Sequence, residues 1–222
     1  FFTSGGTESD NMAINCAIKD HNISHAITTK IEHHAVLHPL QQLEKSGNIK
    51  LSYVDVNSDG LICLDSLEKI LKNSSRSFVS IMHANNEIGT IHDISLIGDI
   101  CKKYSAIFHS DTVQTVGHYP IDLKSLNIDF IAASAHKFHG PKGIGFIYIS
   151  EKIQINPMLR GGSQERNMRA GTENISGIAA LALSMELAYK NLNSDMVYIK
   201  KLKKYMIKKL KSHIKGIEFF AK

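Results

Sequence analysis

The sequence is poor in the features that mark disulfide-rich, zinc-binding and membrane-spanning proteins. Its 222 residues include only three cysteines, Cys16, Cys63 and Cys101, which are far apart and form no CxxC pair. A disulfide framework or a zinc knuckle is therefore not expected, and the cysteine usage fits a reducing compartment. No run of about 18 or more apolar residues is present, so we expect no membrane-spanning helix. No initiator methionine or signal-peptide pattern opens the chain, and we expect it to be a fragment.

Several catalytic and metal-binding signatures are absent as well. No nucleophile elbow, dinucleotide-binding GxGxxG or Walker GK[ST] appears in the required context. His34 and His38 are one helical turn apart, but no HExxH glutamate accompanies them, so no metal site is expected. Residues 55–60, DVNSDG, fit the start of a calcium loop, yet Ser66 occupies the position of its bidentate glutamate. We interpret DVNSDG as a turn.

The formal net charge of +5 comes from one segment. Residues 200–215 contain eight lysines and no acidic residue, so the rest of the chain has a net charge of −3. Apolar residues recur there at helical spacing, at Ile199, Leu202, Met206, Leu210 and Ile214. Such a helix could bind nucleic acid or a membrane surface, but we expect a solvated basic face whose apolar stripe packs on the domain. Neither nucleic acid nor a membrane is therefore expected as the main partner.

Strand-like and helical segments alternate along most of the chain. Strands are expected over 25–30, 50–56, 77–83, 106–111, 129–136 and 143–150, and helices over 34–47, 61–73, 93–105 and beyond 175. Gly47 is a plausible helix stop, and Asp65 and Glu68 are spaced like a helix N-cap and its N3 partner. This alternation predicts an α/β fold, a three-layer αβα sandwich with a mainly parallel sheet. In such sheets ligands bind outside the carboxyl ends of the strands.

Two of the unusual segments are typical of phosphate and cofactor binding. TSGGTESDN (3–11) is a glycine turn that runs into a helix with Thr7 and Ser9 in its first residues. It is either a phosphate cradle or a plain turn with a capping residue. Asp111 ends the strand of AIFHSDTVQ, three residues before Gln114. Its carboxylate could cap the next helix, or pair with the protonated ring nitrogen of an electron-sink cofactor.

Lys137 follows an apolar strand and is preceded by His136. A lysine that forms a Schiff base needs its pKa lowered by desolvation or by a neighbouring cation, and this position offers both. The alternative is an ordinary solvent-facing lysine. His33 opens a helix after a strand, where a flat imidazole could stack on a cofactor ring.

Six motifs in order identify a family. TSGGTESDN, EHHAVL, HANNEIGTI, DTVQTVG, SAHKFHGPKGIG and GGSQERNMRAGTEN together resemble a cysteine desulfurase of the housekeeping iron–sulfur-cluster type, a fold-type I pyridoxal-phosphate enzyme. The resemblance runs from residue 2 to about residue 180. It implies conversion of L-cysteine to L-alanine, with the sulfur passed as a persulfide to an iron–sulfur scaffold or another acceptor. It also implies a homodimer in the cytoplasm, or in the mitochondrial matrix of a eukaryote.

The resemblance assigns roles by matching position. Lys137 would form the Schiff base with pyridoxal 5'-phosphate and move the substrate's α-proton. The cofactor's phosphate would be held by Gly6, Thr7, Ser134 and His136, its ring by His33 and Asp111, and its hydroxyl by Asn86 and Gln114. Thr172 would reach the phosphate of the neighbouring subunit. Val113 stands where other members often carry another small residue, a mild departure.

The resemblance also predicts the domain organisation. Residues 1–180 would form the cofactor-binding large domain without its N-terminus, and 181–222 a helical connection toward an absent C-terminal small domain. The persulfide cysteine and the arginine that binds the substrate carboxylate belong to that small domain, so this chain alone is expected to be inactive. The alternatives are a selenocysteine lyase or aminotransferase of the same superfamily, or an inactive fragment that binds partners.

Overall fold

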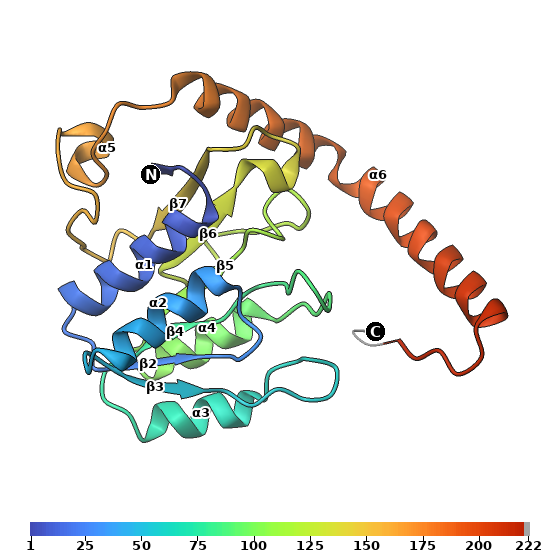
Figure 1. The fold of residues 1–222 in the computed structure, drawn as a ribbon, viewed down its shortest axis with the longest axis horizontal. Helices are drawn as coiled ribbons and strands as arrows, with labels where there is room; N and C mark the ends of the chain where they lie inside the picture. Colours follow the sequence, from blue (N-terminus) through green and yellow to red (C-terminus); the bar gives the residue numbers. More distant parts are fainter. Residues whose placement is uncertain (220–222) are drawn as a thin grey trace.

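The computed structural model describes residues 1–219, which are built around one seven-stranded sheet (Figure 1). The strands are β1 (Phe2–Thr3), β2 (His25–Thr28), β3 (Lys50–Tyr53), β4 (Phe78–Ser80), β5 (Ile107–Asp111), β6 (Phe130–Ser134) and β7 (Gly145–Ile149). Their order across the sheet is β1-β7-β6-β5-β4-β2-β3. Strands β2 to β6 pair in parallel, whereas β7 is antiparallel to β6 and to β1. The prediction of a mainly parallel sheet is confirmed.

Helices cover both faces of the sheet. Helices α1 (Gly6–Asp20) and α2 (His34–Lys45) pack on one face. Helices α3 (Leu64–Lys72), α4 (Ile94–Lys103) and the first turns of α6 (Ile175–His213) pack on the other. Successive residues of β4 point to opposite faces, so Phe78 joins the core under α1 while Val79 joins the core under α4. This arrangement is the predicted three-layer αβα sandwich.

The helix starts follow local capping chemistry where a suitable side chain is present. The carboxylate of Asp93 accepts hydrogen bonds from the backbone N–H groups of Ser95 and Leu96, at 3.0 and 3.1 Å, and begins α4. Gly47, with φ of 72°, follows the last turn of α2 as predicted.

The predicted cap of α3 is wrong. Helix α3 begins at Leu64 with Cys63 as N-cap, which places Asp65 inside the first turn. The Glu68 carboxylate instead binds the ammonium of Lys103, the last residue of α4, and the hydroxyl of Tyr104, which follows it. The Glu68 side chain therefore links α3 to the end of α4 and does not cap the start of α3.

The segment 55–60 is a turn, as expected. The Asn57 side-chain oxygen accepts hydrogen bonds from the backbone N–H groups of Asp59 and Leu61, at 3.0 and 2.9 Å. Gly60 has φ of 76°, a conformation that favours glycine. An isolated bridge between Val56 and Ile62 closes the turn ahead of α3.

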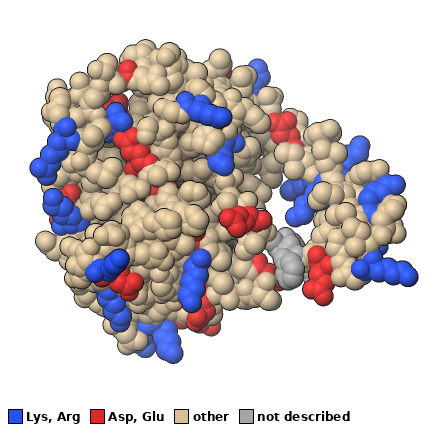
Figure 2. Space-filling model, viewed as in Figure 1, with Lys and Arg blue, Asp and Glu red and all other residues tan. Residues whose placement is uncertain are grey.

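Helix α6 leaves the body after its first turns and projects away from it (Figure 1). Figure 2 shows Lys and Arg side chains along this projecting part. Ile199, Leu202, Met206 and Ile214 are each about half exposed, so the predicted packing of their stripe on the domain is wrong within residues 1–219. Among residues 1–219, no helix is both long enough and apolar enough to cross a membrane.

Candidate functional site

A cavity of about 240 Å³ opens where β5 and β6 end and α1 begins. Its lining contains the predicted site residues Gly6, Thr7, His33, Asn86, Asp111, Gln114, Ser134, His136 and Lys137, together with Asp10, Met82 and Val113. Thr172 is the one predicted site residue that lies outside it. The volume lies just below the usual range of ligand pockets, which suits a compact single-ring ligand.

The first turn of α1 forms one end of the cavity. Its N-cap is Gly5, which has no side chain to occupy the free backbone N–H groups of that turn. A Cβ on Gly6 would lie 2.6 Å from the Val113 Cγ2 atom, so only glycine lets the helix end approach this wall. The Ser134 hydroxyl and His136 Nδ1 lie 2.8 Å apart nearby, both on the cavity wall. Helix N–H groups with a hydroxyl and an imidazole form a binding site for a phosphate.

Asp111 lies at the end of β5 and is 5% exposed. Burial, followed by the neighbouring Asp10 carboxyl group, raises the pKa of Asp111 to about 7. Its Oδ1 accepts a hydrogen bond from the Val113 backbone N–H at 2.9 Å, so it shapes a loop and caps no helix. A buried carboxylate of this kind is stabilised by a cation in the cavity, as a protonated ring nitrogen would be.

Lys137 lies on a short 3₁₀ helix, η1 (Ala135–Phe138), that continues β6. Its backbone carbonyl lies 2.8 Å from His118 Nε2. The Lys137 and His33 side chains both line the cavity and are both exposed. The expectation that Lys137 is desolvated is therefore wrong for residues 1–219 by themselves, because the cavity is open on its side.

The sequence interpretation missed a layer of buried groups behind the cavity. Asp10 is one helical turn after Gly6, and this i, i+4 spacing was the signal that could have found it. Glu32 is 5% exposed, and its Oε1 accepts hydrogen bonds from the Thr29 hydroxyl at 2.8 Å and the Met82 N–H at 3.1 Å. Burial raises the pKa of both acids to about 8.

Thr172 is exposed on the segment that follows the short helix α5 (Gln164–Asn167). Three residues earlier, Arg169 binds the Glu8 carboxylate through two N···O contacts of 2.8 and 3.2 Å. Although burial raises the pKa of Glu8, the hydrogen bonds from Arg169 and Ser4 outweigh it and hold that pKa below its usual value. The ion pair fixes this segment to the first turn of α1, beside the cavity.

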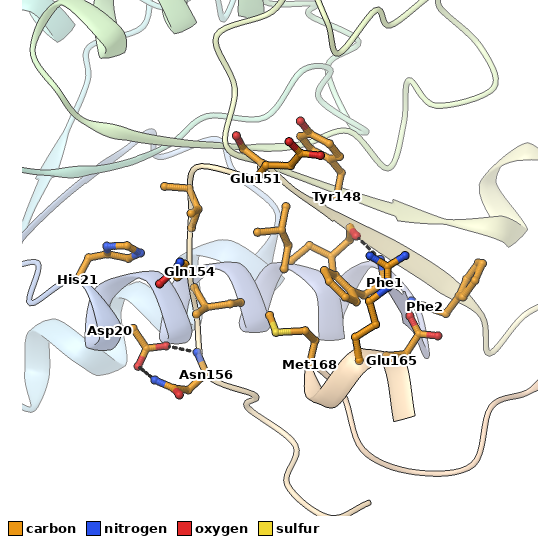
Figure 3. Close-up of a pocket in the computed structure, with 16 residues that line it drawn as sticks. Phe1, Phe2, Asp20, His21, Tyr148, Glu151, Gln154, Asn156, Glu165 and Met168 are labelled. Atoms are coloured by element: carbon orange, nitrogen blue, oxygen red, sulfur yellow. Dashed lines mark hydrogen bonds between the residues drawn. The ribbon is translucent and has the colours of Figure 1, made fainter. Parts of the chain in front are cut away.

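A larger cavity, of about 1230 Å³, lies on another part of the surface (Figure 3). Phe1, Phe2 and Met168 form part of its wall, and the Asp20 carboxylate accepts two hydrogen bonds from Asn156 at its rim. None of the predicted site residues lines it. Its lining includes the acids Asp20, Glu151 and Glu165, but no lysine side chain and no residue from the N-terminus of α1.

Residues 1–219 contain no group of three or more His, Cys, Asp and Glu placed to hold a metal ion. The rings of His34 and His38 stack with centroids 4.6 Å apart. Cys16 and Cys101 are buried in helices, Cys63 is exposed, and none of the three lines the smaller cavity.

The chain is similar to proteins named cysteine desulfurase IscS. It is 45% identical to that of Dictyoglomus turgidum over 97% of this chain, and 45% identical to that of Methanosarcina thermophila, also over 97%. Among solved structures, a NifS-like protein matches with a TM-score of 0.91 at 41% identity, covering 95% of this chain and 58% of that one. The NifS-like protein of Rickettsia africae matches with a TM-score of 0.87 at 36% identity, covering 99% and 61%. The chain spans about 55% of the curated relatives' length.

Pyridoxal phosphate is the cofactor of this group, and the smaller cavity fits its chemistry. The helix N-terminus suits the phosphate, Asp111 suits the ring nitrogen, and Lys137 supplies an amine for the aldehyde. The aminotransferase class-V model matches residues 1–222. The chain belongs to the aminotransferase class-V family.

Proposed function

We propose that the full-length protein is a pyridoxal-phosphate-dependent cysteine desulfurase that converts L-cysteine to L-alanine. The observation that carries the proposal is the cavity that places Lys137 together with Asp111 and the N-terminus of α1. The similarity to cysteine desulfurases along nearly the whole of this chain supports the choice of reaction within the class-V family.

Different residues of the cavity would bind the phosphate, the ring and the hydroxyl of the cofactor. The N–H groups of Gly6 and Thr7, with Ser134 and His136, hold the phosphate. Asp111 keeps the ring nitrogen protonated because its buried carboxylate is stabilised by that cation. His33 orients the ring by stacking, and Asn86 and Gln114 orient its hydroxyl through hydrogen bonds. Of these side chains, Asp111 and Ser134 are buried, Gln114 is partly buried, and His33, Asn86 and His136 are exposed.

Lys137 would hold the cofactor through its aldehyde carbon, and its amine would accept and return the proton of the substrate's Cα. Pyridoxal phosphate supplies the electron sink for the charge that develops at that carbon. The C–S bond of L-cysteine breaks, a cysteine thiol of the enzyme takes the sulfur as a persulfide, and L-alanine leaves. Because Cys16, Cys63 and Cys101 lie away from the cavity lining, we assign the persulfide to a cysteine outside this chain.

The same proposal includes the partners. A homodimer would bring Thr172 of one subunit to the phosphate site of the other, since Thr172 is exposed and lies outside its own cavity. The persulfide would pass to an iron–sulfur scaffold or another acceptor, in the cytoplasm or the mitochondrial matrix. Residues 1–180 would be the cofactor domain and 181–222 the connection to a smaller one.

Trapping the cofactor covalently tests the proposal. The full-length protein is loaded with pyridoxal phosphate and reduced with borohydride, and the modified peptide is mapped by mass spectrometry. We expect the adduct on Lys137 in the native protein and in Lys142→Ala, which alters an exposed lysine of the same loop, and its loss in Lys137→Ala. A Lys137→Ala protein with the same adduct as the native protein would refute the assignment.

Substrate turnover separates the alternatives. L-cysteine should give equal amounts of alanine and, with a thiol present, sulfide. Preference for L-selenocysteine would indicate a selenocysteine lyase, and amino-group transfer to a keto acid would indicate an aminotransferase. A folded protein with no adduct would favour the partner-binding fragment.

A further inference from the structure

Behind Asp111 lies a row of three buried side chains from three different elements. Asp10 on α1 faces His109 on β5, with Oδ1 and Nε2 3.3 Å apart. The other ring nitrogen, Nδ1, lies 2.8 Å from the Ser80 hydroxyl on β4. All three residues are at most 1% exposed, so no bulk water reaches them.

The two facing atoms have only each other. Within the described chain, neither Asp10 Oδ1 nor His109 Nε2 has any other hydrogen-bond partner. Their separation of 3.3 Å lets a small rotation complete a hydrogen bond. Unpaired buried polar atoms are costly, so we expect a proton between them.

This pair contacts the proposed cofactor site directly. His109 and Asp111 are two residues apart on β5 and therefore point to the same side of the strand. Asp10 lines the cavity together with Asp111. The other titratable groups facing this region are Glu32, after β2, His33 at the start of α2, and His136 and Lys137 on η1.

The charge on the pair decides how strongly Asp111 holds a cation. Two carboxylates close together in a buried site do not both ionise at low cost. Burial raises the pKa of Asp10 to about 8, and burial lowers the pKa of His109 to about 4, so both are uncharged at neutral pH. In that state the Asp10 O–H donates to Nε2, and the Nδ1–H donates to the Ser80 hydroxyl.

We propose that Asp10 and His109 are positioning residues for Asp111: they hold one proton between them, carry no net charge, and leave the negative charge of the cluster on Asp111. The inference rests on the proposed function, because it assigns Asp111 to the cofactor's ring nitrogen. Asp10 donates its hydrogen bond to His109 and not to Asp111. The Asp111 carboxylate therefore keeps its full basicity, and with it its interaction with the protonated ring nitrogen.

Nitrogen NMR of the bound cofactor tests this directly. The full-length protein is loaded with pyridoxal phosphate labelled with ¹⁵N in the ring, and the ring-nitrogen shift is followed against pH. Asp10→Asn keeps a neutral donor toward His109 and should leave the titration unchanged. His109→Leu removes the acceptor, so the Asp10 O–H turns to Asp111 and the ring nitrogen should lose its proton roughly one to two pH units lower.

Two further variants separate positioning from general damage. His109→Gln places an amide oxygen near Asp10 and should restore most of the native titration. Ser110→Ala removes a buried hydroxyl from the opposite side of the same strand and should change nothing. A shifted titration in Asp10→Asn, or a native one in folded His109→Leu, would overturn the inference while leaving the proposed function intact. If no variant or native protein binds the cofactor, both fail.

Discussion

Glu32 offers a test of the buried acid layer that does not depend on catalysis. Its carboxyl group joins the loop after β2 to the loop after β4, through the Thr29 hydroxyl and the Met82 N–H. A second bond between these loops runs from the Asn85 side-chain N–H to the Ile31 carbonyl, at 2.6 Å. These loops carry His33 and Asn86, so Glu32 supports two proposed cofactor contacts from behind.

The sign of the pH effect follows from the pKa of Glu32. Burial raises it from 4.5 in the unfolded chain to about 8 in the folded one. Above pH 4.5 the unfolded chain has lost this proton while the folded chain keeps it, so stability falls as the pH rises toward 8. One proton corresponds to about 1.4 kcal/mol per pH unit, which gives a loss of roughly 2 kcal/mol between pH 6.5 and pH 8.

Glu32→Gln should remove this loss. The glutamine oxygen can accept the same two hydrogen bonds, and its amide group replaces the protonated oxygen at the same volume. Because the amide never ionises, we expect the cofactor-free variant to lose roughly 2 kcal/mol less stability than the native protein between pH 6.5 and pH 8. Asp10 and Asp111 titrate in both proteins, so their contributions largely cancel in the difference.

Urea unfolding between pH 6.5 and 8, followed by circular dichroism, measures the difference. Glu44→Gln is the matched control, because Glu44 is exposed on α2, and its curve should run parallel to the native one. If Glu32→Gln were also parallel to the native curve, or became less stable as the pH rises, Glu32 would be ionised in the folded protein and the reasoning would be refuted.

Two further changes test the walls of the site. Gly6→Ala should weaken cofactor binding at least tenfold, because the added Cβ would lie 2.6 Å from the Val113 Cγ2 atom. Adding Val113→Ala to the same protein should restore binding. Cofactor fluorescence measures the affinity of both variants. Arg169→Ala removes a half-buried pair with Glu8, so we expect a loss of about 1 kcal/mol in thermal unfolding and faster proteolysis nearby. Arg160→Ala, at an exposed position, should show neither effect; equal behaviour of the two variants would contradict a role for the pair.

The residues that line the cavity were predictable because they lie at the edge where a parallel sheet places its functional groups. Asp111 and Lys137 follow the ends of neighbouring strands, and Gly6 begins the helix that packs between them. Each is preceded by an apolar run or a glycine turn, which makes it stand out in the sequence. Regular alternation of strands and helices then brings them to one edge.

The buried pair behind Asp111, formed by Asp10 and His109, was not predictable in the same way. Asp10 looks like any acidic residue in the first turns of a helix, and His109 lies inside a strand between Phe108 and Ser110. Their significance comes from a contact between elements far apart in the chain. The failed cap of α3 has the same cause, because Ser66 and the Cys63 N–H bind Asp55 while Glu68 turns to α4.

Lys137 lies at an exposed position, although its sequence context predicted a desolvated one. A lysine that forms a Schiff base needs desolvation or a neighbouring cation to hold it uncharged. Residues 1–219 leave the Lys137 side chain exposed, while they bury Asp111 and the acids behind it. The chain therefore builds the buried acidic side of the site, and the exclusion of water around the amine depends on groups added to it. Bound cofactor and substrate, and the second subunit of the proposed dimer, are the groups that would cover this face.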